Sequence, residues 1–219
     1  MQKNLVNNAI ILAAGLSSRF GGTPKGLAKC CGEILVERLI RQLNEAGIYD
    51  IILVVGHKKE LFEYLGDRVK IIENNKFATD NNLSSILSAR NYLGNSYVCP
   101  SDVYFIYNPF NSSEEESYYA VSYKIGSTKE WCIKGKKYIE EVSIGGSDSF
   151  VLLGHSFWDE KFSKKFLELA DKEYNRSWMW EDLYIRHLDI LKMRPKICKF
   201  IYEFDTKDEL EDFEKWNTL

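Results

Sequence analysis

Short apolar runs alternate with amphipathic segments along the first half of the chain, and this alternation restricts the fold more than any other feature. Ala9–Ala13 (AIILA) and Ile51–Val55 (IILVV) have no polar face, which is typical of strands buried on both sides of a parallel sheet. Between them, Ile34–Ala46 has apolar residues at helical spacing and is followed by Gly47. Strands and helices in alternation predict an open, doubly wound α/β sheet.

The same alternation of strands and helices continues to about residue 117, and a run of short expected strands then follows. The further elements expected in the first half are a helix at Lys58–Leu65, a strand at Val69–Ile72, a helix at Ser84–Leu93 and a strand at Ser96–Cys99. Those expected in the second half are short strands at Tyr118–Tyr123, Trp131–Lys134, Tyr138–Ile144 and Ser149–Leu153, helices at Ser163–Tyr174 and Met179–Leu191, a strand at Lys199–Glu203 and a helix at Lys207–Trp216. We therefore predict one α/β domain over residues 1–219. Its mixed, mostly parallel sheet would be flanked by helices and carry a β-rich insertion in the second half.

Composition excludes several classes of protein. Hydrophobic residues make up 45% and charged residues 28% of 219 residues, which argues against disorder. The net charge of −3 gives no basic field for nucleic acid, and no apolar stretch has the ~20 residues of a membrane span. Five cysteines without a CxxC pair fit reduced thiols, and the N-terminus has no signal-peptide pattern. We expect a cytoplasmic protein without a nucleic-acid or membrane partner; a homo-oligomer is left open.

A loop rich in glycine, serine and basic residues leaves the first strand, over Leu12–Leu27 (LAAGLSSRFGGTPKGL). Its chemistry-bearing residues are Gly15, Ser17, Ser18, Arg19 and Lys25. A glycine turn can point backbone N–H groups at an anion, and a guanidinium and an ammonium can hold phosphate oxygens. The loop follows a strand at its carboxyl end, where open α/β sheets bind ligands. It lacks GxxxxGK[ST] and GxGxxG, which argues against a P-loop or dinucleotide fold. A phosphate-binding loop is favoured over a merely solvated one.

The motifs LAAGLSSRF and TPKGL resemble the signature loop of nucleotidyltransferases, which join a nucleoside triphosphate to a phosphorylated substrate and release pyrophosphate. The resemblance implies a Rossmann-like nucleotidyltransferase fold, with nucleotide contacts from Leu12, Ala13, Ala14, Gly15, Ser17 and Ser18. It implies catalytic roles for Arg19, which would hold the phosphates, and Lys25, which would stabilise charge at the reacting phosphorus. Only five residues separate Arg19 from Lys25, fewer than in the sugar-nucleotide members, so the loop does not choose the branch.

Later motifs narrow the resemblance to the bacterial CTP:phosphocholine cytidylyltransferases. The matching segments are Ile72–Phe105, KEWCI at Lys129–Ile133, GHSFWD at Gly154–Asp159 and IYEFDTKDEL at Ile201–Leu210. The resemblance implies Mg²⁺-dependent condensation of CTP with phosphocholine to give CDP-choline and pyrophosphate. Residues up to about 117 would bind the nucleotide, and residues from about 118 to 219 the acceptor.

Two alternatives stay open at this stage. The acceptor could instead be 2-aminoethylphosphonate, phosphoethanolamine or a sugar 1-phosphate, with the same fold and chemistry. A more distant alternative is a non-catalytic nucleotide-binding module, against which the joint presence of Arg19, Lys25 and Asp102 argues.

Two aspartates are candidate ligands for Mg²⁺. Asp102 lies just past the fourth strand of the first half, at the sheet edge that carries the loop, and Asp205 ends a late strand. Mg²⁺ is usually held by one or two carboxylates together with substrate phosphates, and the resemblance suggests the same pair. A turn or helix-cap role is the alternative, especially for Asp205. The family carries another acid two residues before Asp102, where this chain has Pro100.

Asn82 and Ser85 are candidate contacts to the cytosine base, since they lie where a loop meets a helix N-terminus and the resemblance places the base nearby. Capping of that helix is the alternative for both, and it is weighed equally with base contact for Asn81.

Aromatic residues concentrated in the second half are candidates for the acceptor site. A quaternary ammonium cannot donate hydrogen bonds, so proteins hold it against aromatic faces and negative charge. The candidates are Trp131, Trp158, Trp180, Tyr202 and the acidic Glu181. The alternative for any one of the tryptophans is packing in the core.

Overall fold

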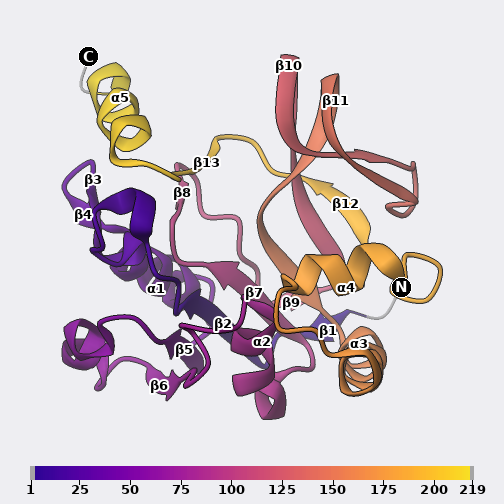
Figure 1. The fold of residues 1–219 in the computed structure, drawn as a ribbon, viewed down its shortest axis with the longest axis horizontal. Coiled ribbons are helices and arrows are strands. Elements are labelled where there is room, and N and C mark those ends of the chain that lie inside the picture. Colours follow the sequence, from indigo (N-terminus) through magenta and orange to yellow (C-terminus); the bar gives the residue numbers. More distant parts are fainter. Residues whose placement is uncertain (1–2, 218–219) are drawn as a thin grey trace.

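The computed structural model describes residues 3–217, and its elements are those labelled in Figure 1. The strands are β1 Asn4–Leu5, β2 Asn8–Ala13, β3 Lys29–Cys30, β4 Glu33–Ile34, β5 Ile51–Val55, β6 Lys70–Glu73, β7 Ser96–Pro100, β8 Val103–Phe105, β9 Ser113–Glu114, β10 Tyr118–Lys134, β11 Glu141–Trp158, β12 Arg194–Ile197 and β13 Ile201–Glu203. The α-helices are α1 Leu35–Glu45, α2 Leu83–Ser88, α3 Glu160–Glu173, α4 Trp180–Arg186 and α5 Lys207–Asn217. Short 3₁₀ helices are η1 Ser18–Phe20, η2 Lys25–Leu27, η3 Lys59–Leu65 and η4 Arg90–Tyr92. No helix in this part of the chain is long and apolar enough to cross a bilayer.

The main sheet has seven strands in the order β12-β10-β11-β7-β2-β5-β6. Its pairs are parallel except where β11 meets β10 and β7. The predicted mixed, mostly parallel sheet flanked by helices is confirmed. The β10–β11 hairpin extends well beyond the sheet, as Figure 1 shows at the upper right, and forms the predicted β-rich part of the second half.

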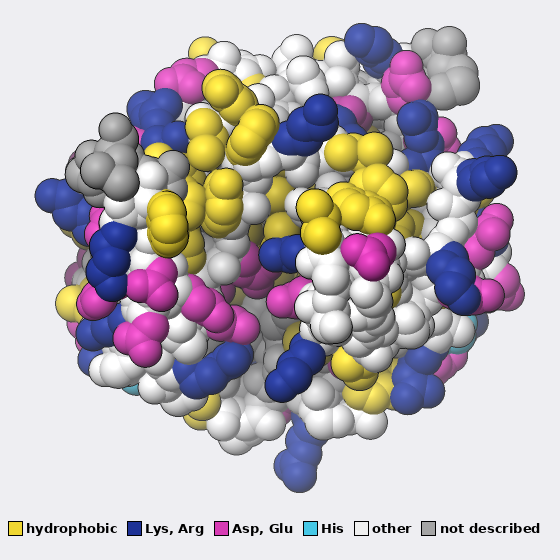
Figure 2. All heavy atoms as spheres, turned by 90° about the horizontal axis from the view of Figure 1, so that it is seen from above, with side chains coloured by type: hydrophobic (Ala, Val, Ile, Leu, Met, Phe, Trp, Pro, Cys, Tyr) yellow, Lys and Arg dark blue, Asp and Glu magenta, His cyan; other side chains and the backbone are white. Residues whose placement is uncertain are grey.

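The chain crosses over at β2. After β2 it forms β5 on one side and later returns to form β7 on the other, so the strand order reverses at this point. In open α/β sheets such a reversal leaves a crevice at the carboxyl ends of the strands, where ligands bind. Seen from above, the surface is hollowed near its centre, with acidic and basic side chains along the hollow and hydrophobic groups on either side (Figure 2).

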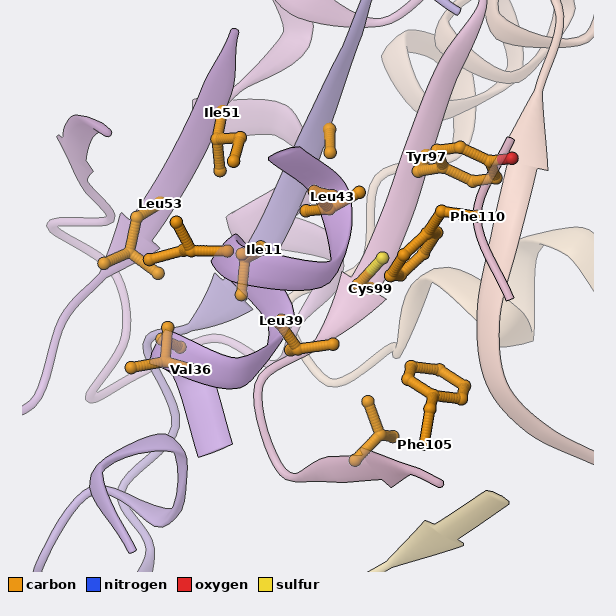
Figure 3. Close-up of a cluster of buried hydrophobic side chains, with 14 of the residues drawn as sticks. Ile11, Val36, Leu39, Leu43, Ile51, Leu53, Tyr97, Cys99, Phe105 and Phe110 are labelled. Atoms are coloured by element: carbon orange, nitrogen blue, oxygen red, sulfur yellow. The ribbon is translucent and has the colours of Figure 1, made fainter. Parts of the chain in front are cut away.

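One face of the sheet is covered by α1. Its residues Val36, Leu39 and Leu43 are buried against Ile11 of β2 and Leu53 of β5, and Figure 3 shows them pointing toward these strands. The apolar positions of α1 recur every three or four residues, which places them on one side of the helix. This packing fixes β2, and with it the start of the loop that follows.

The opposite face is covered by α2, α3 and α4. A second buried cluster joins Leu83 and Ile86 of α2 to Phe162 of α3 and Leu183 of α4. Trp158, at the end of β11, is wholly buried at its centre. The layer attaches the second half of the chain to the sheet beside the crevice.

Several predicted boundaries differ from the structure. Lys59–Leu65 is a 3₁₀ helix rather than an α-helix, and α3 starts at Glu160 because Asp159 caps it by accepting the N–H of Phe162 at 2.8 Å. The strands predicted at Tyr118–Tyr123 and Trp131–Lys134 are both parts of β10, and those at Tyr138–Ile144 and Ser149–Leu153 fall mostly within β11. Only the breaks predicted inside each pair are wrong, since β10 and β11 each run continuously through Gly and Ser positions as bulges. The edge strand β12 was not predicted because Pro195 interrupts its strand pattern.

Candidate functional site

The loop after β2 is organised by Ser17. This residue has a left-handed φ of 51°, and its hydroxyl accepts a hydrogen bond from the backbone N–H of Lys25 at 3.1 Å. Its carbonyl accepts the N–H of Gly22, which itself has a φ of 73° that favours glycine. The loop therefore closes on itself over these residues and brings Arg19 and Lys25 to the same side of the crevice.

Lys25 lies between two carboxylates from distant parts of the chain. Its Nζ is 3.0 Å from Oδ2 of Asp102 and 2.7 Å from Oδ1 of Asp205. Asp102 is in the turn between β7 and β8, and Asp205 follows β13. The antiparallel pairing of β8 with β13 holds the two segments together, helped by a bond from the N–H of Phe204 to the carbonyl of Asp102 at 3.2 Å. Residues predicted to act together thus meet in one place.

Arg19 makes the outer contact of this group. Its guanidinium donates to both carboxylate oxygens of Asp205, at 3.2 and 3.3 Å, with 66% of its side chain exposed. An ion pair this exposed stabilises the fold little. The guanidinium can therefore exchange the carboxylate for phosphate oxygens, which have the same bidentate geometry.

The opposite charges of the basic and acidic residues at this site stabilise one another. Burial would lower the pKa of Lys25, but the neighbouring carboxylates of Asp102 and Asp205 outweigh it and raise the pKa. Burial would likewise raise the pKa of Asp205, but Lys25 and Arg19 outweigh it and lower the pKa. Lys25 is therefore a cation, and Asp205 an anion, at neutral pH.

A third acidic side chain, Glu203, lies beside this pair at the end of β13. It lines the same cavity, and its pKa is raised well above the ordinary value, first by desolvation among the surrounding atoms and then by the charges of Asp102 and Asp205. A cation bound between these carboxyl groups would relieve their mutual repulsion.

The carboxyl groups fit a divalent cation with a preference for oxygen. Mg²⁺ in phosphoryl-transfer sites takes one or two carboxylates and completes its shell with substrate phosphates and water. Asp102 and Asp205 already share one cation, the ammonium of Lys25. The residues present at the site therefore fit the expected Mg²⁺.

A cavity of about 450 Å³ opens from this charged group. One wall is the loop after β2 together with the start of α2, and the other wall is formed by β10, β11 and α4. Both halves of the chain thus line a single cavity, in the size range of small-molecule sites.

The far wall of the cavity combines aromatic rings with a buried carboxyl group. The ring of Tyr119 stacks on Trp180 with centroids 5.4 Å apart, and the hydroxyl of Tyr119 donates to Oε1 of Glu181 at 3.2 Å. The other oxygen, Oε2 of Glu181, is buried and has no hydrogen-bond partner among the residues that the structure describes. Burial raises the pKa of Glu181 to about 7. The carboxyl group of Glu181 therefore lacks a positively charged partner among the described residues.

The start of α2 completes the wall that carries the loop after β2. Oδ1 of Asn82 accepts the backbone N–H of Trp180 at 2.8 Å, and its side chain makes no capping bond to α2. The hydroxyl of Ser85 accepts a bond from the buried Asn74 at 3.0 Å. Asn81 instead bonds to the backbone carbonyl of Ser177 at 3.2 Å and so holds the loop before α4. Asn82 and Ser85 face the cavity between its nucleotide-loop wall and its aromatic wall.

Most of the predicted site residues gather around this one cavity. Those that line it are Leu12, Ala13, Ala14, Gly15, Ser17, Ser18, Arg19, Lys25, Asn82, Ser85, Asp102, Trp180 and Glu181. Asp205 is joined to these residues by the hydrogen bonds that it accepts from Lys25 and Arg19.

Three predicted acceptor-site residues lie elsewhere. Trp158 is 0% exposed and packs against Phe166 in the core, so it presents no surface to a ligand. Tyr202 is on β13 with its ring against Phe213 of α5, 4.4 Å between centroids. Trp131 is half-buried on β10 and packs against the second core cluster. Their aromatic character serves packing in this structure.

Sequence reasoning missed Glu203, Tyr119 and Asn74. Glu203 was detectable, because alternation along the strand IYEFD places it on the same face as Asp205. Tyr119 and Asn74 gave no local signal, since each reaches the site only through the pairing of strands far apart in sequence.

Comparison with known proteins agrees with this geometry. A family model described as a MobA-like NTP transferase domain matches residues 9–111. A choline-phosphate cytidylyltransferase of Streptococcus pneumoniae is 34% identical, over 94% of this chain and 96% of its own length. A 2-aminoethylphosphonate cytidylyltransferase of Lancefieldella rimae is 33% identical, over 94% of this chain and 92% of its own.

Among solved structures, the CTP:phosphocholine cytidylyltransferase of Streptococcus pneumoniae superimposes with a TM-score of 0.93 at 30% identity. The match covers 97% of this chain and 100% of the other. A UDP-glucose pyrophosphorylase superimposes with a TM-score of 0.74 at 14% identity, which shows the shared fold alone.

Proposed function

The chain belongs to the nucleotidyltransferase family, and on that premise we propose that it condenses CTP with phosphocholine to give CDP-choline and pyrophosphate. One observation carries the proposal: Lys25, Asp102 and Asp205 meet at one end of a cavity whose other end holds Glu181 among aromatic rings. The two ends suit the two substrates, a triphosphate and a cationic phosphomonoester.

In the proposed reaction, a phosphate oxygen of the acceptor attacks the α-phosphorus of CTP. A new P–O bond forms as the bond to the β-phosphate oxygen breaks, and pyrophosphate leaves with that electron pair. The loop of Gly15 and Ser17 binds the triphosphate through backbone N–H groups, and Arg19 pairs with its outer oxygens. Lys25 neutralises the charge that develops at the α-phosphate, which is the main task in such transfers.

Asp102 and Asp205 would hold Mg²⁺, with Glu203 as a further oxygen beside them. When bound, the ion would neutralise phosphate charge and orient the triphosphate. These carboxylates also fix Lys25 in place, since its ammonium is bonded to two of them. Positioning and charge neutralisation suffice, and no covalent enzyme intermediate is needed.

The acceptor end favours a cation. The acidic side chain of Glu181 lies there, and its buried Oε2 lacks a partner among the described residues. A sugar 1-phosphate could offer hydroxyl donors to this carboxyl group but no positive charge to pair with it. Phosphocholine, phosphoethanolamine and 2-aminoethylphosphonate all bring a positive charge.

Among cationic acceptors, the surroundings of Glu181 favour the trimethylammonium group. The lining of the cavity includes Tyr119, Leu152, Met179 and Trp180, and the polar Asn82 also lies beside Glu181. A primary ammonium has three N–H donors to satisfy, whereas a quaternary ammonium needs only negative charge and aromatic or apolar contact. 2-Aminoethylphosphonate is the second candidate, because a relative of similar identity is named for it and because its ammonium group can also pair with Glu181.

The proposed reaction also bears on where the protein works. Its five cysteines are free thiols, the state expected in a reducing compartment, and its proposed co-substrate CTP is a metabolite of the cell interior. We infer a cytoplasmic location for the reaction.

The nucleotide part of the proposal is tested by measuring pyrophosphate release with phosphocholine and each of CTP, UTP, GTP and ATP, with Mg²⁺ present. We expect turnover with CTP far above the other three. Asp102→Asn should lower kcat by about 10²-fold or more, because a charge-stabilising group is lost. Asp189→Asn, an exposed position in the turn after α4, is the matched control. Release only with UTP or GTP, or full activity of Asp102→Asn, would refute the assignment.

A further inference from the structure

Two adjacent thiols and a carboxylate meet outside the cavity just described. Cys30, Cys31 and Glu214 each bring one ligand atom within 4.8 Å of the other two. The two Sγ atoms are 4.0 Å apart, and Oε1 of Glu214 accepts the backbone N–H of Cys31 at 2.7 Å. The cysteines are on the β3–β4 hairpin and the glutamate is on α5, which lies over that hairpin in Figure 1.

The hairpin turn presents both thiols to the same point. Cys31 and Gly32 form a two-residue turn between paired Cys30 and Glu33, with positive φ values of 50° and 87°. Such turns favour Asn, Asp and Gly, because other side chains are strained at positive φ. A cysteine in this position is therefore not explained by the turn, and it leaves one thiol exposed next to a buried one.

The spacing of the sulfur atoms suits a tetrahedral ion. With Zn–S bonds of about 2.3 Å, two thiolates on one zinc lie about 3.8 Å apart. The observed separation is 4.0 Å, so the two thiols need only a small adjustment to share one ion. A carboxylate oxygen completes three protein ligands and leaves a fourth position for water, as zinc sites allow.

We propose that Cys30, Cys31 and Glu214 form a binding site for one thiophilic divalent cation, of the Zn²⁺ type, that links the β3–β4 hairpin to α5. On binding, each thiol loses its proton to solvent, and the two thiolates and the carboxylate donate to the ion. Mg²⁺ is excluded, because it prefers an all-oxygen shell.

The electrostatics of the cluster without a metal ion agree with this assignment. Burial raises the pKa of Cys30 to about 12, with further contributions from Cys31 and Glu214. Without a cation the buried thiol thus keeps its proton, and a divalent ion bound beside it would favour the thiolate.

The position of the site gives it a structural effect. Cys30 is five residues after Lys25, and Glu214 is nine residues after Asp205, so the ion would tie together the two segments that carry these residues. Cys30 already packs with Phe204 and Phe213 in a buried cluster between the hairpin and α5. A bound ion should therefore stabilise this contact and raise the Tm.

The test uses the full chain, stripped of metal, kept reduced and free of phosphate, with Co²⁺ as the spectroscopic probe and Zn²⁺ as competitor. We expect one Co²⁺ per chain with a thiolate-to-cobalt charge-transfer band, displaced by Zn²⁺, and a rise in Tm with Zn²⁺. Cys31→Ser should abolish the band, and Glu214→Gln should weaken Zn²⁺ binding by about tenfold or more. Cys31 is exposed in a turn, so this variant should keep the wild-type Tm without metal.

Cys198→Ser is the matched control, since this half-buried thiol lies on another part of the molecule and should leave the band unchanged. The proposal is overturned if the wild type gives no thiolate band, if Cys31→Ser retains it, or if Cys198→Ser removes it. None of these outcomes depends on turnover, so they are independent of the proposed cytidylyl transfer.

Discussion

Lys25 illustrates how single residues carry the chemistry of this site. Its side chain is 17% exposed and bonds to two carboxylates, so its position is fixed before any substrate arrives. A preorganised cation loses little on meeting a triphosphate, because it does not need to be ordered then. Fixed charge of this kind explains why three residues from distant parts of the chain are needed together.

Replacing Lys25 with Ala should lower kcat by about 10²–10³-fold, because the charge at the α-phosphate would lose its fixed counter-charge. Steady-state kinetics with CTP and phosphocholine measure this. Lys164→Ala, an exposed lysine on α3, is the control and should keep the wild-type kcat. A Lys25→Ala enzyme that retains most of its turnover would remove Lys25 from the mechanism.

Glu181 should make acceptor binding depend on pH. Burial raises its pKa to about 7, so in the free protein it ionises as the pH rises from 6 to 8. A cationic acceptor prefers the ionised form, and its KM should therefore fall with rising pH, by up to about tenfold over this range. The prediction is checked by measuring the KM for phosphocholine at saturating CTP over this pH range.

The matched variant is Glu181→Gln, which keeps the shape but never ionises. It should bind phosphocholine more weakly and show only the pH dependence of the substrate's own phosphate. Identical pH profiles in the two proteins would mean that Glu181 does not face the acceptor's charge.

At the residue scale, the charged members of the site could be predicted and the aromatic ones mostly could not. Arg19 and Lys25 stand in a contiguous motif with its own spacing, which no other role explains. Trp158 and Trp180 are indistinguishable in the sequence; both are buried in the structure, at 0% and 3% exposure, and of the two it is Trp180 that lines the cavity. Burial depends on contacts between distant segments, which local patterns do not encode.

Among the elements, the β10–β11 hairpin departs most from the sequence prediction. Glycines and serines near residues 126 and 146 suggest turns between short strands, but in the structure both strands continue through them with shifts of register. Gly and Ser tolerate the bulged backbone that bends a long ribbon. The helices were easier to predict, since α1 and α5 have clear apolar periodicity and Gly47, with a φ of 83°, follows the end of α1.

Gly154 is a point where the hairpin meets β13. Its φ is +88°, and a methyl group there would overlap with Cδ1 of the buried Ile201. Gly126 of the same hairpin has a φ of +76° with nothing nearby, so Ala at that position meets only backbone strain. Gly154→Ala should therefore lower the free energy of unfolding by about 1–3 kcal/mol more than Gly126→Ala.

Urea unfolding of both variants measures the difference. Gly154 lines the cavity and Ile201 begins the strand that ends at Glu203, so the Gly154 variant should also lose activity. Equal free energies of unfolding for the two variants would show that the hairpin does not pack closely against β13 at Gly154.

At the scale of the whole molecule, the site depends on the crossover of the sheet. The loop after β2, the turn after β7 and the segment after β13 meet because the strand order reverses at β2 and β8 pairs with β13. The reversal of strand order at β2 follows from the alternating apolar runs. The pairing of β8 with β13 does not, because these strands are three residues each and nearly a hundred residues apart.

His155 should make the whole fold sensitive to acid. It is fully buried among Tyr97, Phe105, Phe110 and Tyr118, and burial lowers its pKa from 6.5 to about 3. Between these values the unfolded chain binds a proton that the folded chain does not, so stability falls as the pH is lowered from 6.5 toward 3. At pH 4 the loss from this one group is roughly 3 kcal/mol.

Urea unfolding at pH 7 and pH 4, in the wild type and in His155→Gln, isolates this contribution. Gln does not ionise, and the variant should lose roughly 3 kcal/mol less between the two pH values than the wild type does. If both proteins lose the same amount, His155 is not held neutral by the fold.

The central claim is that a triphosphate-binding charge group and a cation-binding wall share one cavity and serve one reaction, cytidylyl transfer to phosphocholine. It is tested most directly by kcat/KM with CTP and Mg²⁺ for phosphocholine against 2-aminoethylphosphonate as competing acceptors. The apolar and aromatic surroundings of Glu181 predict a higher kcat/KM for phosphocholine. A higher value for 2-aminoethylphosphonate, or no pyrophosphate release with either acceptor, would contradict the account.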